Sequence, residues 1–193
     1  MNNTEREPNR KEKTEKEGKS RVVAEILEYV KIIIVVGALV FVINNFFVLN
    51  ARIPSESMEN TIMEGDQLFG NRLAYRNSDP QRYDIVIFKY PDNEKQLFIK
   101  RVIGLPGETV NIVDGKVYIN DDPTPLDDSF LPEKMEGDFG PYQVPENCYF
   151  MLGDNRNWSN DSRSWVNTYV RRDQILAKAA LRYWPLTKIG FIQ

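Results

Sequence analysis

The sequence predicts a mainly β protein, in which an antiparallel β-sheet domain is preceded by one N-terminal transmembrane helix. An uncharged apolar run covers Ile32–Leu49. Beyond it, short apolar runs alternate with Gly, Pro, Asn and Asp, a pattern typical of antiparallel strands joined by turns. Residues 52–193 are numerous enough to form one compact domain with its own core.

The apolar run is long enough to cross a membrane. As a helix, Ile32–Leu49 measures about 27 Å, close to the ~30 Å of a hydrocarbon core, and its flanks extend the predicted helix to residues 29–51. The alternatives are a buried core helix and a cleavable signal peptide. A signal peptide has a short basic leader and ends in small residues, whereas this leader has 31 residues and the run ends in Phe46-Phe47-Val48-Leu49. We therefore expect a retained anchor.

The charges beside the run predict its orientation. Only Arg52 follows it within twenty residues, whereas the cationic residues before it include Lys11, Lys13, Lys16, Lys19, Arg21 and Lys31. Because positive flanks stay in the cytoplasm, residues 1–28 are predicted to form a cytoplasmic, disordered tail. Residues 52–193 are then extracytoplasmic, and the protein is a single-pass protein of the cytoplasmic membrane that contacts the lipid bilayer.

Composition excludes several functions. Residues 52–193 carry 17 Lys and Arg against 21 Asp and Glu, so nucleic acid is not an expected partner. Cys148 is the single cysteine and cannot form an internal disulfide, and its apolar neighbours indicate a buried thiol. The chain has no histidine. Neither a metal nor an organic cofactor is implied, and a reactive serine would need a different base.

Several segments of the domain have clear signals. Two apolar runs are the clearest strands, Asp84–Tyr90 and Leu97–Ile103, and Tyr149–Leu152 is expected to resume the sheet. Asn111–Ile119 predicts a hairpin, because Asp114-Gly115 supplies the positive φ angles of a two-residue turn. The hairpin belongs to a small hairpin and loop excursion over about residues 107–148, in which Asp121–Pro141 is polar and carries four prolines. Gln174–Leu181 fits either a helical stripe or an outer strand.

Four aromatic residues admit two interpretations: Trp158, Trp165, Trp184 and Phe191. Aromatic side chains favour membrane interfaces, but they also fill protein cores. Core packing is the default expectation for all four.

Lys100 is a candidate base. In a strand, Phe98 and Val102 share its face, so the amine is flanked by apolar groups and its neutral form is favoured. Lowering a lysine pKa from about 10.4 to near 7 requires about 4–5 kcal/mol, which full burial supplies. A neutral amine is a competent base for a serine hydroxyl. Alternatively, Lys100 extends to solvent at a strand edge.

Ser57 is the candidate nucleophile, in the sequence Ile53-Pro-Ser-Glu-Ser-Met58. It lies eight residues beyond the apolar run, at most about 29 Å of extended chain, so any chemistry of Ser57 takes place near a membrane surface. Pro54 favours an extended backbone at Ile53, which suits pairing with a peptide. Alternatively, the segment is a turn or a helix N-cap.

The segment Gly153–Arg163 is dense in short polar residues, which predicts a loop held by hydrogen bonds between side chains and backbone. A calcium loop is disfavoured, because two ligand positions fall on Arg156 and Trp158.

Together and in this order, these features resemble the bacterial type I signal peptidases, the Ser-Lys membrane peptidases that release exported proteins. The motifs are Ser55-Glu-Ser57-Met58, Phe98–Gly107 and Gly153–Arg163, and the resemblance extends from the anchor to Leu186. It implies a membrane-bound serine endopeptidase whose β domain is catalytic and which cuts signal peptides from preproteins after small residues. The implied partners are preprotein substrates, the bilayer and the secretion translocon.

The resemblance assigns roles by position. Ser57 matches the nucleophile, which forms an acyl-enzyme, and Lys100 matches its general base. Ser55 matches a residue that helps hold the oxyanion, and Ser159 matches one that orients the lysine amine. Asp161 and Arg163 match a structural ion pair. The shallow pockets for small residues match four positions: Ile53, Pro54, Phe98 and Ile99.

The sequence departs from the family pattern at a few positions. Asn60 replaces a proline, Asn157-Trp158 replaces an Asp-Asn pair, and Val166 replaces a glycine. None of these changes removes a catalytic group, so they bear on loop geometry and on substrate preference.

Three other functions are alternatives to this interpretation. Self-cleavage of the repressor type uses similar Ser-Lys chemistry, but the chain has a membrane span and lacks a DNA-binding segment. The signal peptidases of the endoplasmic reticulum are excluded if, as the resemblance implies, they use histidine in place of this lysine. A membrane-tethered scaffold of the secretion machinery would tolerate Lys100→Arg, whereas an enzyme would not, because arginine does not deprotonate.

Overall fold

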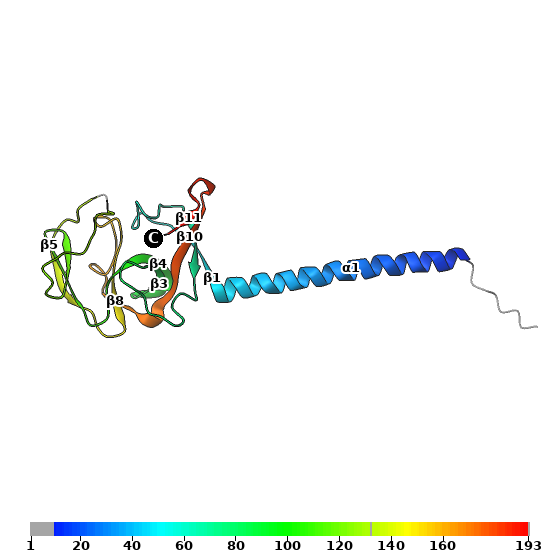
Figure 1. The fold of residues 1–193 in the computed structure, drawn as a ribbon, viewed down its shortest axis with the longest axis horizontal. Helices are drawn as coiled ribbons and strands as arrows, with labels where there is room; N and C mark the ends of the chain where they lie inside the picture. Colours follow the sequence, from blue (N-terminus) through cyan, green and yellow to red (C-terminus); the bar gives the residue numbers. More distant parts are fainter. Residues whose placement is uncertain (1–9, 132, 193) are drawn as a thin grey trace, which may run out of the picture. The chain divides into compact units, whose positions relative to one another are not determined.

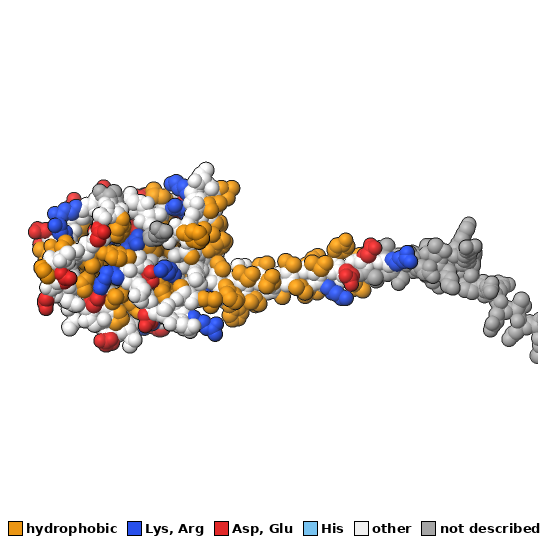
Figure 2. All heavy atoms as spheres, viewed as in Figure 1, with side chains coloured by type: hydrophobic (Ala, Val, Ile, Leu, Met, Phe, Trp, Pro, Cys, Tyr) orange, Lys and Arg blue, Asp and Glu red, His pale blue; other side chains and the backbone are white. Residues whose placement is uncertain are grey.

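The structure is a computed structural model that describes residues 10–131 and 133–192. It contains two units, Met1–Ile43 and Asn44–Gln193 (Figure 1). Helix α1 (Arg10–Val42) is followed by one turn of π-helix, η1 (Ile43–Phe47). Within these elements, Glu25–Phe47 is long and apolar enough to cross a membrane, and its apolar side chains are exposed (Figure 2). The predicted N-terminal apolar helix is confirmed.

The predicted limits of the helix, 29–51, are wrong at both ends. Residues 10–28 of the tail predicted to be disordered are helical, because the tail is rich in the strong helix formers Glu, Lys and Arg; residues 1–9 lie outside the described part. At the other end, Val48–Arg52 is strand β1. It pairs with β2 (Gln67–Asn71), and Leu49 is buried in the domain core rather than available to lipid.

The second unit is built on an antiparallel sheet of eight strands. Their order is β1-β2-β10-β3-β4-β8-β9, with β11 (Gly190–Phe191) alongside β10. The remaining strands are β3 (Ile85–Tyr90), β4 (Asn93–Gly104), β8 (Cys148–Leu152), β9 (Val170–Arg171) and β10 (Ile175–Trp184). The mainly antiparallel β fold is therefore confirmed. The two clearest predicted strands correspond to β3 and β4, and Tyr149–Leu152 lies in β8.

Strand β10 differs from its prediction. Gln174–Leu181 is neither helical nor an outer strand, because β10 lies between β2 and β3. Its buried residues alternate along the strand, and Ala177 and Ala179 present small side chains to the core. Close packing selects these alanines: a Cβ at Gly70 of β2 would lie 3.0 Å from the Cβ of Ala177.

A second sheet occupies the excursion. It has the order β6-β5-β7 and comprises β5 (Thr109–Val113), β6 (Lys116–Ile119) and β7 (Phe139–Gln143). Asp114 and Gly115 form the hairpin turn with φ angles of 51° and 68°, as predicted. The excursion is more than a hairpin and a loop, because the end of the proline-rich stretch enters the sheet as β7. Val110, Ile112 and Val117 pack with Phe150 in the core that joins this sheet to β8.

The exposed aromatic residues correct another expectation. Trp165 is 5% exposed and packs in the core as predicted, but Trp158, Trp184 and Phe191 are 79%, 48% and 84% exposed. Core packing is therefore the wrong interpretation for these three. Cys148 is half-buried, so the expected burial of its thiol is only partial.

Candidate active site

Lys100 is buried in the middle of the sheet. It lies on β4, which pairs with β3 on one side and with β8 on the other, and it is 3% exposed. The alternative of a solvent-exposed lysine at a strand edge is therefore wrong. The Phe98 ring lies on the same face, with its centroid 5.5 Å from Lys100 Nζ. Burial lowers the pKa of Lys100 to about 8, while the nearby carboxylates of Asp161 and Asp154 oppose that shift.

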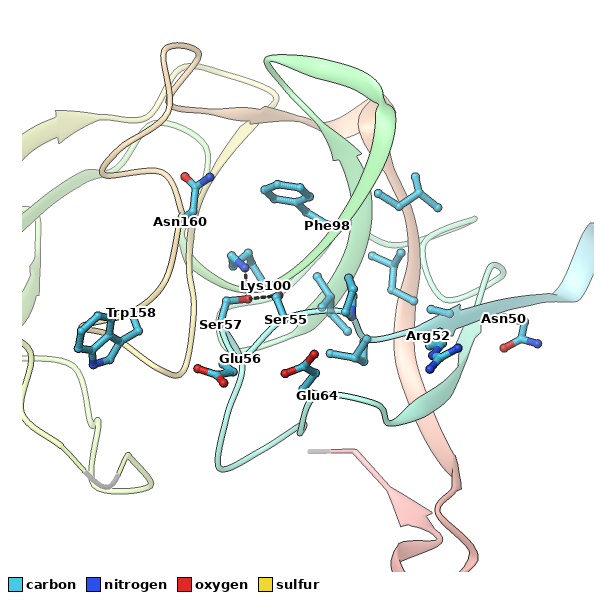
Figure 3. Close-up of a pocket in the computed structure, with 16 residues that line it drawn as sticks. Asn50, Arg52, Ser55, Glu56, Ser57, Glu64, Phe98, Lys100, Trp158 and Asn160 are labelled. Atoms are coloured by element: carbon cyan, nitrogen blue, oxygen red, sulfur yellow. Dashed lines mark hydrogen bonds between the residues drawn. The ribbon is translucent and has the colours of Figure 1, made fainter.

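Ser57 meets this amine. It lies in the turn that follows β1 and is 7% exposed, and a hydrogen bond of 2.5 Å joins its Oγ to Lys100 Nζ (Figure 3). Met58 and Ile62 anchor the turn in the core, because both side chains are fully buried. The Ile62 N–H also donates to the Met58 carbonyl. Ser55 Oγ lies 3.4 Å from Ser57 Oγ. The two predicted residues of the dyad, which are far apart in the sequence, are therefore in direct contact.

Two buried aspartates near Lys100 are each paired with an arginine. Arg101 donates from Nε and Nη2 to the two carboxylate oxygens of Asp154, at 2.8 and 2.7 Å. Arg163 contacts Asp161 in the same way, at 2.8 and 2.9 Å. The predicted Asp161–Arg163 ion pair is thus present in the structure. Each guanidinium offsets a negative charge that would otherwise favour protonated Lys100.

The loop Gly153–Arg163 packs directly on the turn that carries Ser57. A Cβ at Gly153 would lie 2.1 Å from Ser159 Oγ and 2.3 Å from the Ser57 carbonyl oxygen, so only glycine fits there. Ser159 Oγ is itself buried, and within residues 10–131 and 133–192 it has no hydrogen-bond partner. The structure places Ser159 beside the turn but does not join it to Lys100. Its orienting role stays a prediction.

Side-chain contacts join this loop to the excursion, and no motif in the sequence predicted them. Arg156 is 2% exposed and forms a two-pronged ion pair with Asp128, at 2.5 and 2.9 Å. Asn157 contacts two backbone groups of the same segment: its Nδ2 donates to the Lys134 carbonyl, and its Oδ1 accepts from the Glu136 N–H. Asp128 lies in a polar stretch without periodicity, so no local pattern pointed to it.

A groove of about 710 Å³ runs past Ser57 and Lys100. Its walls include all four residues predicted to receive the substrate: Ile53, Pro54, Phe98 and Ile99. Ile87 and Leu97 add apolar surface, and the groove also extends to Trp158 (Figure 3). The geometry therefore offers a hydroxyl, a base of lowered pKa and an apolar channel in one place.

In the described residues, no group of three Cys, Asp or Glu side chains is arranged to hold a metal ion, and the absence of a metal stays a prediction.

Comparison with known proteins decides the family. The family described as signal peptidase, peptidase S26, matches residues 26–184. The chain belongs to this family. The predicted resemblance to bacterial type I signal peptidases is thereby confirmed, and this signal peptidase is a serine peptidase anchored by an apolar helix.

The relatives span most of the chain. A probable signal peptidase I-2 of Synechocystis sp. is 41% identical over 152 residues, which cover 76% of this chain and 68% of the relative. Signal peptidase I P of Bacillus subtilis subsp. natto is 31% identical over 174 residues, which cover 85% and 92% of the two chains. A crystal structure of a signal peptidase I from Enterococcus faecalis V583 is 36% identical and covers 52% of this chain and 97% of that one, with a TM-score of 0.45.

Gly153→Ala is expected to reduce peptide cleavage by more than about tenfold and to lower the thermal unfolding temperature. The added methyl group forces apart Ser159 and the Ser57 backbone, and overpacking of this kind costs about 1–3 kcal/mol. Gly190→Ala is the matched control, since a Cβ there meets no atom within 4 Å. Thermal unfolding and cleavage by the detergent-solubilised chain measure both effects. Equal behaviour of the two variants would contradict the steric argument.

Lys100→Met is expected to stabilise the protein at pH 6 while removing activity. Because the folded-state pKa lies near 8 and the ordinary value is 10.5, the unfolded chain binds more protons between these limits. The free energy of unfolding of the wild type therefore rises from about pH 8 to 10.5, whereas the variant lacks this rise. The gain of the variant, on the order of 1–3 kcal/mol, should shrink as the pH increases. Urea unfolding at several pH values measures it, with exposed Lys116→Met as control; a gain independent of pH would refute the argument.

Proposed function

We propose that Ser57 and Lys100 are the catalytic dyad with which this signal peptidase cuts signal peptides from exported preproteins. One observation carries the proposal: a buried amine of lowered pKa and a serine hydroxyl share a 2.5 Å hydrogen bond in the wall of an apolar groove. Burial of both groups excludes water from the contact, and this strengthens the interaction that deprotonates the serine.

The geometry supports an acyl-enzyme mechanism. Neutral Lys100 takes the proton of Ser57 Oγ as that oxygen attacks the carbonyl carbon of the scissile bond. The Ser57 N–H and the Ser55 hydroxyl donate to the oxyanion that develops. The Lys100 ammonium then protonates the leaving amine, the C–N bond breaks, and an ester to Ser57 remains. Lys100, neutral again, accepts a proton from the water that hydrolyses this ester.

The groove supports binding of an extended peptide with small side chains near the cut. Strand β1 lies at the edge of the sheet, and its residues Asn50, Ala51 and Arg52 line the groove. A peptide backbone can pair with such an edge, and the neighbouring pockets then receive alternate side chains. The buried side chains of Ile53 and Ile99 line the groove and take up room in it, so we expect small residues before the cut to fit best.

The proposed setting is the outer face of the cytoplasmic membrane. The excess of Lys and Arg before the span supports a cytoplasmic N-terminus and an extracytoplasmic domain. The bilayer and the translocon, through which preproteins pass, are the proposed partners. Ser57 lies ten residues beyond Phe47, an extended length of about 36 Å, so enzyme and membrane-held substrate meet in a thin layer that raises their effective concentration.

The central test compares dyad variants in the detergent-solubilised, full-length chain. With a preprotein that bears small residues before its cleavage site, wild type should release the signal peptide. Ser57→Ala and Lys100→Arg should each reduce the rate by at least about 10³-fold, because the first lacks the nucleophile and the second carries a group that stays charged. Gel analysis of the products measures the rate. Undiminished cleavage by either variant would refute the catalytic role of the dyad and favour the non-catalytic scaffold.

The pH dependence provides a second test. Lys100 must be neutral to act as a base, so kcat/KM should increase with pH and level off above an apparent pKa of about 8. Arg163→Gln removes a positive charge and leaves Asp161 unpaired, which favours protonated Lys100 and should move the profile to higher pH. Arg82→Gln is the control, because Arg82 pairs with Glu108 outside the groove. A profile that is identical in both variants would argue against this electrostatic role of the pair.

A further inference from the structure

Trp158 lies at one end of the groove, and few neighbouring atoms cover its indole ring. It is 79% exposed, and it lies on the opposite side of Ser57 from Asn50 and Arg52 (Figure 3). We propose that Trp158 and the carboxylates beside it bind the substrate residues that follow the cut, and that they favour a basic side chain there. This inference rests on the proposed function, since it takes the apolar pockets as the place of the residues before the cut.

The direction of the peptide follows from the position of Ser57 within the groove. Residues before the cut occupy the side formed by β1, Ile53 and Ile99, and the scissile carbonyl lies at Ser57. A chain that continues in the same direction leaves over Glu56 and Trp158, which line the groove beyond the serine. A substrate that follows this direction leaves the groove beside Trp158, which is the largest side chain of its lining.

A second hollow of about 430 Å³ continues from this exit. Glu56 and Trp158 belong to both the groove and the hollow, so the two are contiguous. Glu59, Asn60 and Glu133 also line the hollow. The hollow is large enough for a long side chain and open to solvent at its rim.

The turn that carries Trp158 is fixed to the catalytic turn. Asn155 donates its N–H to the Ser57 carbonyl at 3.2 Å and its Nδ2 to the Glu56 carbonyl at 3.1 Å. The Trp158 N–H donates to the Asn155 carbonyl at 3.1 Å, and Asn157 is held by the excursion. Because the backbone of the turn is already ordered, little conformational entropy is lost there when a peptide covers the indole.

The charges in the hollow select for a cation. Asp154 and Arg156 are neutralised by Arg101 and Asp128, respectively. By contrast, in the described part of the chain no ion pair involves the carboxylates of Glu56, Glu59 and Glu133. The stem of a lysine or arginine can lie on the indole face while its charge approaches these carboxylates. An acidic side chain is repelled.

The experiment uses three peptides that are identical up to the cut and carry Lys, Gln or Glu as the second residue after it. With the full-length chain in detergent at low salt, kcat/KM should follow Lys > Gln > Glu, with an overall ratio of about tenfold. The ratio should decrease at high salt because mobile ions screen exposed charges. Trp158→Ala and Glu59→Gln should each reduce it about two- to fivefold, while cleavage of the Gln peptide continues.

Matched variants separate the possible outcomes. Trp158→Phe keeps an aromatic face and should retain most of the preference, and exposed Asp121→Asn alters net charge without changing the hollow. Equal cleavage of the three peptides by wild type, or an unchanged ratio in Trp158→Ala, overturns this inference and leaves the peptidase intact. Failure of wild type to cleave any of the peptides, or the preprotein, instead refutes the proposed function.

Discussion

The site depends on Lys100, a buried lysine that forms no ion pair with a carboxylate within residues 10–131 and 133–192. Lys100 is 3% exposed and its hydrogen bond goes to a neutral hydroxyl, so the interior penalises its charged form. That penalty is a cost to folding at neutral pH, which the well-packed cores on both faces of the sheet must offset. The same penalty makes the amine a base near pH 8, so stability and reactivity are opposed at this residue.

The two Arg–Asp pairs are best understood through this lysine. Buried ion pairs add little net stability, because the loss of hydration cancels much of their attraction. Here each arginine pairs with a carboxylate that would otherwise act on the amine. Asp161 also positions backbone, because it accepts from the Gly153 N–H and so keeps the loop against the turn that carries Ser57. Charge neutrality around Lys100 and the geometry of the turn are therefore produced by the same contacts.

Local patterns in the sequence were sufficient for much of the fold. The alternation around Lys100 and the Asp114-Gly115 turn predicted β4 and the hairpin, and the order of the motifs pointed to the dyad. Other features depend on partners that are distant in sequence. Val48 and Leu49 are as apolar as a membrane helix, and only pairing with β2 makes them a strand. Similarly, the Arg156–Asp128 contact joins two polar loops, neither of which has a pattern of its own.

The junction between anchor and domain has a consequence for the chemistry. No residue separates η1 from β1, and β1 is both the edge strand beside the groove and the segment that leads into the catalytic turn. However the two units are oriented, the length of the chain alone keeps Ser57 within about 36 Å of Phe47. β1 is fixed by its register with β2, and its residues also line the groove. Pairing with β2 thus explains why a segment that looks like the end of a membrane helix belongs to the second unit.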